Sequence, residues 1–241
     1  MDRAWRCCEF WQRRLSNKWN ARLFARDHGC RVPDLYWHGR RVSRLPLESL
    51  PAQYVIRPAR GYSGTGVYVM TAGTDLMNGE RYANVRSQLV KTFGHYARVP
   101  LLVEELVTDE SAGDGLPIEY HCHMFGERIG AIEVNSRTGR GPKKTMRNFY
   151  TEDWRPFPQP MRNHYPYGAE FAAPKCLAEI LRCARTLGVA YETYVRIDFY
   201  ASPRGCVFSE FAATPGLGKH FTQYCDEYFE RLWRETFPDA I

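Results

Sequence analysis

The sequence predicts an α+β fold, in which antiparallel sheets are covered by helices. Short apolar segments separated by turn residues recur along the chain and are typical of strands. Two later segments, after residue 176 and after residue 220, instead carry apolar residues at helical spacing. The strands fall into groups joined by short turns, and such neighbours pair as antiparallel hairpins. A uniformly parallel sheet is therefore not expected.

The first helix is expected to begin at Ser16 or Asn17 and to end at His28. Three of its apolar residues share one face: Trp19, Leu23 and Phe24. Gly29 follows at the position where a left-handed C-terminal cap belongs. Pro33 then begins an extended link.

A strand, a glycine-rich loop and a second strand follow. Residues 54–57 form a short apolar segment, and residues 67–70 form another. Between them, residues 58–66 contain three glycines, which is too many for a regular element. We expect this loop to be a mobile lid.

The middle of the chain predicts a further strand and a hairpin. Residues 101–103 are apolar, and the segments 120–125 and 129–134 flank a turn at Gly126-Glu127. Residues 136–148 contain five basic residues, two glycines and a proline but no acid, so a mobile loop is expected there.

Two helices are expected in the C-terminal part. The first has an apolar face formed by Leu177, Ile180, Leu181, Ala184 and Leu187, and it is expected to stop at Gly188. The second covers residues 221–233, with a stripe assigned to the core: Phe221, Tyr224, Cys225, Tyr228, Phe229, Leu232 and Trp233.

Composition favours a folded cytoplasmic protein. The 241 residues are 44% hydrophobic, and no apolar run is long enough for a membrane span or a signal peptide. Residues 1–44 carry a net charge of +7 and the rest −1, a local excess more typical of a solvated helix face than of a nucleic-acid site. The eight cysteines lack paired metal-ligand spacing and are expected as reduced thiols.

The stretch with the clearest chemistry is residues 194–211. It reads as two strands joined by a turn at residues 201–205. Because strand side chains alternate between two faces, Arg196, Asp198 and Tyr200 lie together on one face.

The expected pairing of these strands brings an arginine and two carboxylates together. The pairs are Tyr200 with Cys206, Asp198 with Phe208 and Arg196 with Glu210. Two carboxylates on neighbouring strands provide the oxygen ligands that Mg²⁺ prefers. Asp198 and Glu210 are expected on an accessible cleft face. In isolation, the same residues are also explained by a surface ion pair.

The order of motifs resembles the ATP-grasp superfamily. Its C-terminal signature is Arg-x-Asp, then Glu-x-Asn followed by Pro-Gly, and residues 196–198 and 210–216 are similar to it. Residues 55–66 resemble the strand and phosphate-covering loop, residues 103–107 the adenine-binding hinge, and Asn17-Lys18 the Asp-Lys that opens the region. Within the superfamily, the early helix ending before Val32-Pro33, together with Glu119-Tyr120 and the segment 149–154, resembles the TupA-like group associated with teichuronic acid and capsule biosynthesis.

The resemblance implies an ATP-grasp fold, in which two α+β subdomains clamp ATP between antiparallel sheets. It implies that Asp198 and Glu210 bind Mg²⁺, with Mn²⁺ as an alternative, and that Arg196 stabilises the oxyanion and the phosphoryl group. Lys18 and Arg57 would contact the ATP phosphates.

The other nucleotide-binding positions implied by the resemblance lie in the glycine-rich loop, the hinge and the mid-chain strand: Gly61, Ser63, Gly64, Thr65, Gly66, Glu104, Glu105, Leu106, Val107 and Glu119. The hinge would hold adenine largely through its backbone, and Glu119 would reach the ribose.

Two positions depart from the family pattern. Arg57 stands where the family has a lysine, which keeps the charge but changes the geometry. Ala212 stands where the family has a metal-binding asparagine, so one ligand is missing. A catalytically silent nucleotide-binding relative therefore remains an alternative.

Two further features stay open at this point. His121 and His123 lie on the same face of a strand and share a metal at most as a pair, because no further ligand is identifiable. The basic residues of segment 137–147 are either solvated or fold over an anionic acceptor or the ATP phosphates.

The resulting hypothesis is an ATP- and Mg²⁺-dependent ligase that activates a carboxylate as an acyl phosphate and joins it to an amine or another nucleophile. Surface-polysaccharide or specialised-metabolite biosynthesis is the expected context. The alternatives are an ATP-grasp-type kinase and a non-catalytic nucleotide binder.

The whole chain is expected to form one catalytic unit. It would comprise a basic helical segment (1–44), a lid-type subdomain (about 45–107) and a metal-binding and catalytic subdomain (about 108–241). Few residues precede Lys18, so a homodimer or a partner subunit is expected to complete the acceptor site.

Overall fold

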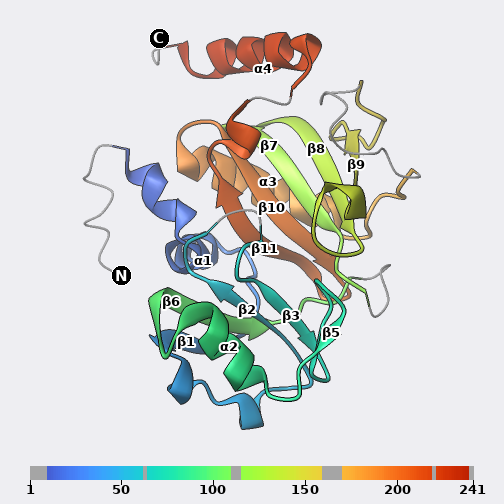
Figure 1. Cartoon of the computed structure of the whole chain (residues 1–241). Helices are drawn as coiled ribbons and strands as arrows, with labels where there is room; N and C mark the ends of the chain where they lie inside the picture. The colour runs from blue at the N-terminus through green and yellow to red at the C-terminus, as the bar shows by residue number, and fades with distance from the viewer. Residues whose placement is uncertain (1–9, 62–63, 110–114, 159–169, 219–220, 239–241) are drawn as a thin grey trace.

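The computed structural model describes residues 10–61, 64–109, 115–158, 170–218 and 221–238. Within these ranges the strands form two antiparallel sheets, one in the lower and one in the upper half of Figure 1. Helices cover the sheets, as expected for an α+β fold. No helix in the described ranges has both the length and the apolar character that a membrane crossing requires.

The first sheet has the strand order β1-β6-β2-β3-β4-β5. Its strands are β1 (Leu35–Arg41), β2 (Gln53–Pro58), β3 (Tyr68–Thr71), β4 (Thr74–Asp75), β5 (Glu80–Arg81) and β6 (Tyr96–Glu105). Helix α2 (Val85–Phe93) packs on one face, where Leu89 meets Ile56, Leu101 and Val103 in a buried cluster. The opposite face of the sheet carries Arg57 and Glu104, which hydrogen-bond to each other.

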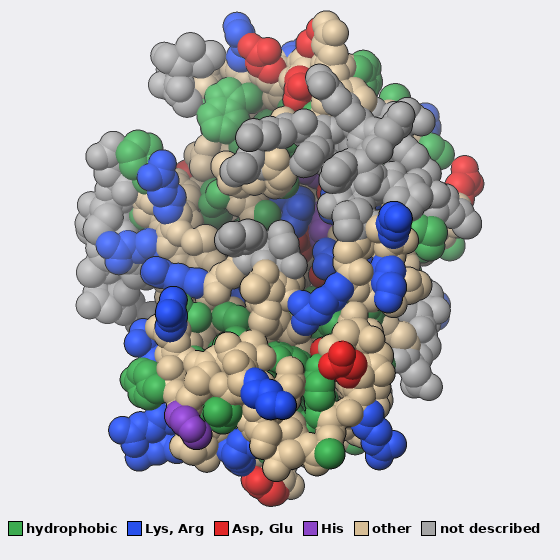
Figure 2. Space-filling model, viewed as in Figure 1, with side chains coloured by type: hydrophobic (Ala, Val, Ile, Leu, Met, Phe, Trp, Pro, Cys, Tyr) green, Lys and Arg blue, Asp and Glu red, His purple; other side chains and the backbone are tan. Residues whose placement is uncertain are grey.

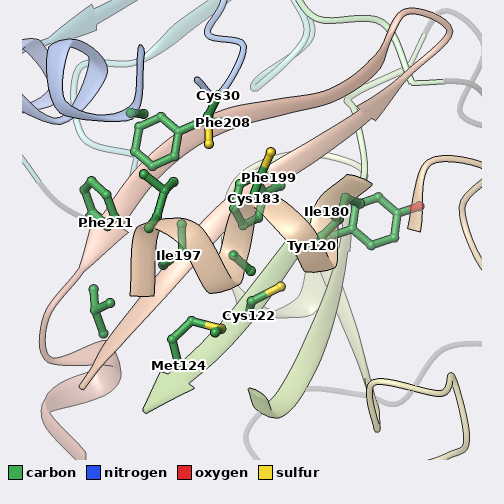
Figure 3. Packing of buried hydrophobic residues seen from close by; sticks show 14 of the residues in the cluster. Cys30, Tyr120, Cys122, Met124, Ile180, Cys183, Ile197, Phe199, Phe208 and Phe211 are labelled. Atoms are coloured by element: carbon green, nitrogen blue, oxygen red, sulfur yellow. The ribbon is translucent and has the colours of Figure 1, made fainter. Parts of the chain in front are cut away.

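The second sheet has the strand order β11-β10-β7-β8-β9. Its strands are β7 (Glu119–Phe125), β8 (Arg128–Arg137), β9 (Thr145–Tyr150), β10 (Val195–Ser202) and β11 (Gly205–Ala212). Helix α3 (Leu177–Tyr191) covers the face that carries Cys122, Ile197 and Phe199 (Figure 3). Because strand side chains alternate, the neighbouring residues of these strands point to the other face, towards the first sheet.

Helix α1 (Lys18–Asp27) connects the two halves. The side chain of Asn17 caps its N-terminus by accepting a hydrogen bond from the Trp19 backbone N–H. Its buried face packs against β11, where the rings of Phe24 and Phe211 meet edge to face at 5.7 Å. Gly29 follows with φ of +76°, as the cap prediction required.

Helix α4 (Gln223–Thr236) packs over the β7–β8 end of the second sheet. Phe125, Phe149 and Phe229 meet there in a further buried cluster. The expected apolar stripe is largely buried, but Tyr224 is 51% exposed and is not part of the core. The other helices within the described ranges are short and of 3₁₀ type: η2 (Trp11–Ser16), η3 (Val42–Arg44), η4 (Leu47–Ser49), η5 (Pro142–Lys144) and η6 (Pro215–Gly218).

Several sequence-based expectations need correction. The extended link after Pro33 is a paired edge strand, β1. Helix α3 does not stop at Gly188 but continues to Tyr191, because Gly188 is needed for close packing and not for a cap. Residues 136–148 are not a simple loop, since β8 runs to Arg137 and β9 begins at Thr145.

Candidate functional site

A cavity of about 610 Å³ lies between the two sheets. Strands β2, β3 and β6 line it from one side, and β7 to β11 line it from the other. In Figure 2, basic, acidic and histidine side chains gather in a hollow near the middle of the face shown. Such a concave site with convergent polar groups is the usual setting for a ligand.

The first-sheet wall of the cavity carries a buried charge cluster. Glu104, which is 1% exposed, accepts hydrogen bonds from Arg57 Nε at 2.7 Å and from Arg22 Nη1 at 2.8 Å. Burial lowers the pKa of Arg57, but Glu104 outweighs that effect and the pKa is raised. Arg57 is therefore a fixed cation, oriented by Glu104 through its Nε edge.

Lys18 enters the cavity from the first turn of α1. Its Nζ lies 2.9 Å from Glu210 Oε2 and 3.5 Å from the Gly61 carbonyl oxygen. Its backbone N–H donates to the Ala59 carbonyl at 2.8 Å, which fastens the helix start to the end of β2. Burial raises the pKa of Glu210, but the charges of Lys18, Arg57 and Arg196 together outweigh it and hold that pKa below its usual range.

The predicted hinge lines the cavity as expected, with Glu105, Leu106 and Val107 at its wall. Apolar side chains next to the hinge complete a surface suited to a flat ring: Val55, Val69 and Leu116. The Glu104 side chain has a second function that sequence reasoning missed, because it also holds Arg22 and Arg57.

The glycine-rich loop lies over the cavity between β2 and β3. Gly61, Gly64 and Thr65 line the cavity, while Ser63 falls outside the described residues. Gly66 does not line it; with φ of +71° it packs against Phe93 and Pro58. Gly66 therefore shapes the loop and is not a lining residue.

Arg140, from the connection between β8 and β9, fastens the glycine-rich loop from the other sheet. Its guanidinium donates to the carbonyl oxygens of Gly64, at 2.8 Å, and of Val67. The basic segment is therefore partly in contact with the loop, while Arg137 and Arg147 line the cavity. The interpretation of this segment as merely solvated is wrong for these three arginines.

The pairing predicted between β10 and β11 is wrong. Asp198 pairs with Glu210 and Arg196 with Ala212, because a bulge shifts the register after Asp198. The hairpin also turns more tightly than expected, since Ser202 pairs with Gly205. The corrected register places the two carboxylates directly opposite each other.

The two carboxylates differ in their surroundings. Glu210 lines the cavity with a side chain that is 33% exposed. Asp198 is 3% exposed and does not line it, because both its oxygens accept hydrogen bonds from Arg196 at 2.8 and 2.7 Å. The expectation that both acids lie on an accessible cleft face is therefore wrong for Asp198.

The pair fits a hard divalent cation by its chemistry. Carboxylates from adjacent strands supply two oxygen ligands, and Mg²⁺ commonly completes its shell with water and phosphate oxygens. Ala212 supplies no side-chain oxygen. Among the described residues, no group of three or more His, Cys, Asp or Glu is arranged to hold a metal. A Mg²⁺ ion at this pair would therefore take its remaining ligands from water and phosphate oxygens.

A row of ionisable side chains crosses the second sheet beside the cavity. Glu210, Asp198, His121 and Glu133 are successive cross-strand partners on β11, β10, β7 and β8. The two ring nitrogens of His121 lie 3.5 Å from Glu133 and 3.6 Å from Asp198. Burial and Arg196 lower the pKa of His121, but the carboxylates outweigh them and raise it. His121 therefore separates the acids, and their charges favour its protonated form.

Two arginines balance the charges of two acids on this side of the cavity, Glu119 and Glu133. Arg137 Nη2 lies 3.0 Å from Glu119 Oε2, and Arg147 Nη1 lies 2.8 Å from Glu133 Oε1. Burial raises the pKa of both acids, but Arg137, His121 and Arg196 together lower that of Glu119 to about 2. Arg147, His121 and His123 together lower the pKa of Glu133 far below its usual range. Sequence reasoning missed Glu133, although an acidic residue inside the apolar strand segment 129–134 was a usable signal.

Two antiparallel sheets that enclose a cavity lined with cations and acids are the arrangement of ATP-grasp proteins. The family model described as TupA-like ATP-grasp matches residues 15–233, and the chain belongs to this family. The family resemblance and the fold predicted from the sequence are thereby confirmed.

Solved structures with similar folds are ATP-grasp ligases of low sequence identity. The D-alanine–D-alanine ligase from Bacillus anthracis complexed with ATP is 14% identical with a TM-score of 0.55, covering 92% of this chain and 65% of that one. The enzyme from Helicobacter pylori is 15% identical with a TM-score of 0.55, covering 94% and 60%. D-cycloserine synthetase DcsG is 13% identical with a TM-score of 0.54, covering 92% and 70%.

These similarities establish the fold. The chain spans less than two thirds of the length of the two D-alanine–D-alanine ligases described above. No curated protein sequence matches the chain significantly.

Proposed function

We propose that the chain is an ATP- and Mg²⁺-dependent ligase that joins a carboxylate to an amine through an acyl phosphate. The observation that carries the proposal is the convergence of Lys18, Arg57 and Arg196 on one cavity beside the paired carboxylates Asp198 and Glu210. These side chains come from α1, from β2 and from the β10–β11 hairpin, so the fold as a whole brings them together.

The reaction has two steps. In the first, a carboxylate oxygen attacks the γ-phosphorus of ATP, the bond to the bridging oxygen breaks, and ADP leaves. In the second, the amine nitrogen bonds to the acyl carbon, the bond from that carbon to the phosphate oxygen breaks, and phosphate leaves. The nitrogen gives up a proton during this step.

The chain's own residues supply positive charge where negative charge develops. Lys18 and Arg57 would hold the phosphates, and Arg196 would face the transferred phosphoryl group and the tetrahedral oxyanion. Asp198 and Glu210 would hold Mg²⁺, which when bound neutralises phosphate charge. The adenine ring would lie against the hinge, and Glu119 would contact the ribose.

The proposed function also includes a class of substrates and a biosynthetic role. The family supports a role in surface-polysaccharide or specialised-metabolite biosynthesis, with a small carboxylate and a small nucleophile as substrates. A second subunit or a partner protein would complete the acceptor site. Because the reaction consumes ATP, the proposal places the enzyme in the cytoplasm.

A nucleotide-binding assay tests the first half of the proposal. ATP with Mg²⁺ should raise the melting temperature, since a ligand at 100 times its Kd stabilises the folded state by about 2.7 kcal/mol. The absence of any shift with millimolar ATP or GTP would contradict nucleotide binding.

A trapping assay tests the second half. Hydroxylamine converts acyl phosphates to hydroxamates, so ATP, Mg²⁺, hydroxylamine and a panel of amino, hydroxy and sugar acids should yield a hydroxamate with at least one acid. A stable phospho-product without hydroxamate would indicate a kinase. Binding of ATP without turnover would indicate a silent relative, the alternative that Ala212 favours.

A further inference from the structure

His123 lies beside Arg196, the residue proposed above to face the transferred phosphoryl group and the tetrahedral oxyanion. His123 on β7 and Arg196 on β10 are direct cross-strand partners, and both line the cavity. Residues directly opposite in an antiparallel pair share a face, with Cβ atoms about 4.5–5.5 Å apart. A nucleophile that attacks a carbonyl group held by Arg196 can therefore approach within reach of His123.

The His123 ring is held so that one nitrogen is available. Nδ1 lies 2.9 Å from the Tyr194 hydroxyl, and the rings of Phe221 and Phe229 flank the imidazole at centroid distances of 5.9 and 5.2 Å. Among the described residues, Nε2 has no hydrogen-bond partner, although the side chain is 1% exposed. A buried polar atom without a partner is costly, and a ligand in the cavity would satisfy it.

The surroundings of this imidazole lower its pKa, which favours the neutral form that can accept a proton. Burial is the main cause that lowers the pKa of His123, and Arg196 and His121 act in the same direction. Glu133 acts in the opposite direction, with its Oε2 atom 3.7 Å from Nε2. A proton accepted by Nε2 would therefore be stabilised by Glu133 through charge attraction.

We propose that His123 accepts the proton that an amine nucleophile loses when it attacks the acyl phosphate, a role that rests on the proposed ligase function. The nitrogen–carbon bond forms, the carbon–oxygen bond to phosphate breaks with its electron pair leaving on phosphate, and the proton passes from the amine nitrogen to Nε2 of His123. Tyr194 positions the ring through Nδ1. The aromatic walls exclude water that would otherwise hydrolyse the intermediate.

The experiment compares two probe nucleophiles in the His123→Gln variant. Hydroxylamine is unprotonated at neutral pH and reacts with acyl phosphates without a catalyst, whereas methylamine depends on help with its proton. With a carboxylate that yields hydroxamate in the wild type, the variant should form hydroxamate within about twofold of the wild-type rate. Its amide formation from methylamine should fall by about 10²-fold or more.

Two further measurements separate a chemical role from a structural one. The matched control is His38→Gln, which changes an exposed histidine of β1 and should leave both products unchanged. Raising the pH from 7 to 9 should restore amide formation in His123→Gln more than in the wild type, because hydroxide and buffer bases then accept the proton that the missing imidazole would take. A misfolded variant would lose both products and would not recover with pH.

The possible outcomes distinguish failure of the His123 role from failure of the ligase proposal. Unchanged amide formation in His123→Gln, equal loss of both products, or wild-type enzyme that forms hydroxamate but no amide would overturn the role of His123. The absence of hydroxamate with every acid of the panel in the wild type would overturn the ligase proposal itself.

Discussion

At the scale of single residues, Asp198 and Glu210 are paired but not equivalent. Glu210→Gln changes a partly exposed side chain, so we expect a melting temperature close to that of the wild type and a loss of the Mg²⁺-dependent shift with ATP. Asp198→Asn removes the charge that compensates the buried Arg196, which should lower the free energy of unfolding by about 3 kcal/mol or more. Denaturant unfolding and thermal shift with and without Mg²⁺-ATP measure both effects.

If Glu210→Gln were less stable than Asp198→Asn, the result would contradict the deeper burial of Asp198. Arg196→Lys provides a third variant, because an ammonium lacks the planar fork that holds both Asp198 oxygens. It should resemble Asp198→Asn in stability and lose turnover.

The ion pair of Glu119 with Arg137 predicts how stability depends on pH. The pKa of Glu119 is about 2 in the folded protein, below the value of about 4.3 expected for an unfolded chain. A depressed carboxyl pKa adds stability above the unfolded value, and that stability is lost as the pH falls from about 4.3 to about 2. Melting temperatures measured between pH 6 and 2 should therefore fall less steeply for Glu119→Gln than for the wild type. Parallel curves would contradict the ion pair with Arg137.

At the scale of secondary-structure elements, Gly188 decides how α3 meets the second sheet. A Cβ atom at this position would lie 2.2 Å from the Gly126 carbonyl oxygen in the turn between β7 and β8. Gly→Ala inside a helix usually stabilises by up to about 1 kcal/mol. Gly188→Ala should instead destabilise by about 1–3 kcal/mol, because the turn and the helix would be forced apart.

Urea unfolding of Gly188→Ala measures this effect, with Val189→Ala as the control. Val189 is the next residue of α3 but is 56% exposed, so its replacement should change the free energy of unfolding by less than about 0.5 kcal/mol. Stabilisation by Gly188→Ala would show that the turn moves freely.

Element types were predicted better than pairing. The C-terminal end of α1 followed from a local signal, because Gly29 acts within a few residues of the helix end. The strand β9 was missed because its basic residues suggest a loop, whereas Arg147 is stabilised by Glu133, a partner on the neighbouring strand. The end of α3 was misplaced because the contact of Gly188 with Gly126 depends on the tertiary structure.

The residues of the candidate site that belong to sequence motifs were predicted, whereas the features that depend on tertiary packing were missed. The convergence of Lys18 and Glu210 followed from the family resemblance, and the structure places them 2.9 Å apart. The bulge after Asp198 left no local signal, and it changed which residue faces Glu210. The availability of His123 Nε2 depends on the Tyr194 contact and on the rings around it, neither of which spacing reveals.

At the scale of the whole molecule, Arg140 ties the glycine-rich loop of the first sheet to the second sheet. Arg140→Ala removes both hydrogen bonds to that loop, so backbone amides over residues 64–67 should exchange with deuterium roughly tenfold faster, a change of about 1.4 kcal/mol in local opening. Hydrogen exchange with mass spectrometry reads this out.

Lys143→Ala is the matched control, because Lys143 belongs to the same basic segment and is exposed. Exchange in the loop should be unchanged in this variant. Equal acceleration in both variants would indicate that general charge, and not the Arg140 contact, holds the loop.

The packing of α1 against β11 has a consequence for synthesis of the chain. The first sheet is complete once Glu105 has been made, since its strands span β1 to β6. Phe24 cannot pack against Phe211 until Phe211 has been synthesised. At about 5–20 residues per second, the intervening chain takes roughly 10–40 s to translate. Throughout that interval the apolar face of α1 lacks its native partner on the ribosome, so a helix that is made early completes its packing only after β11 has been made.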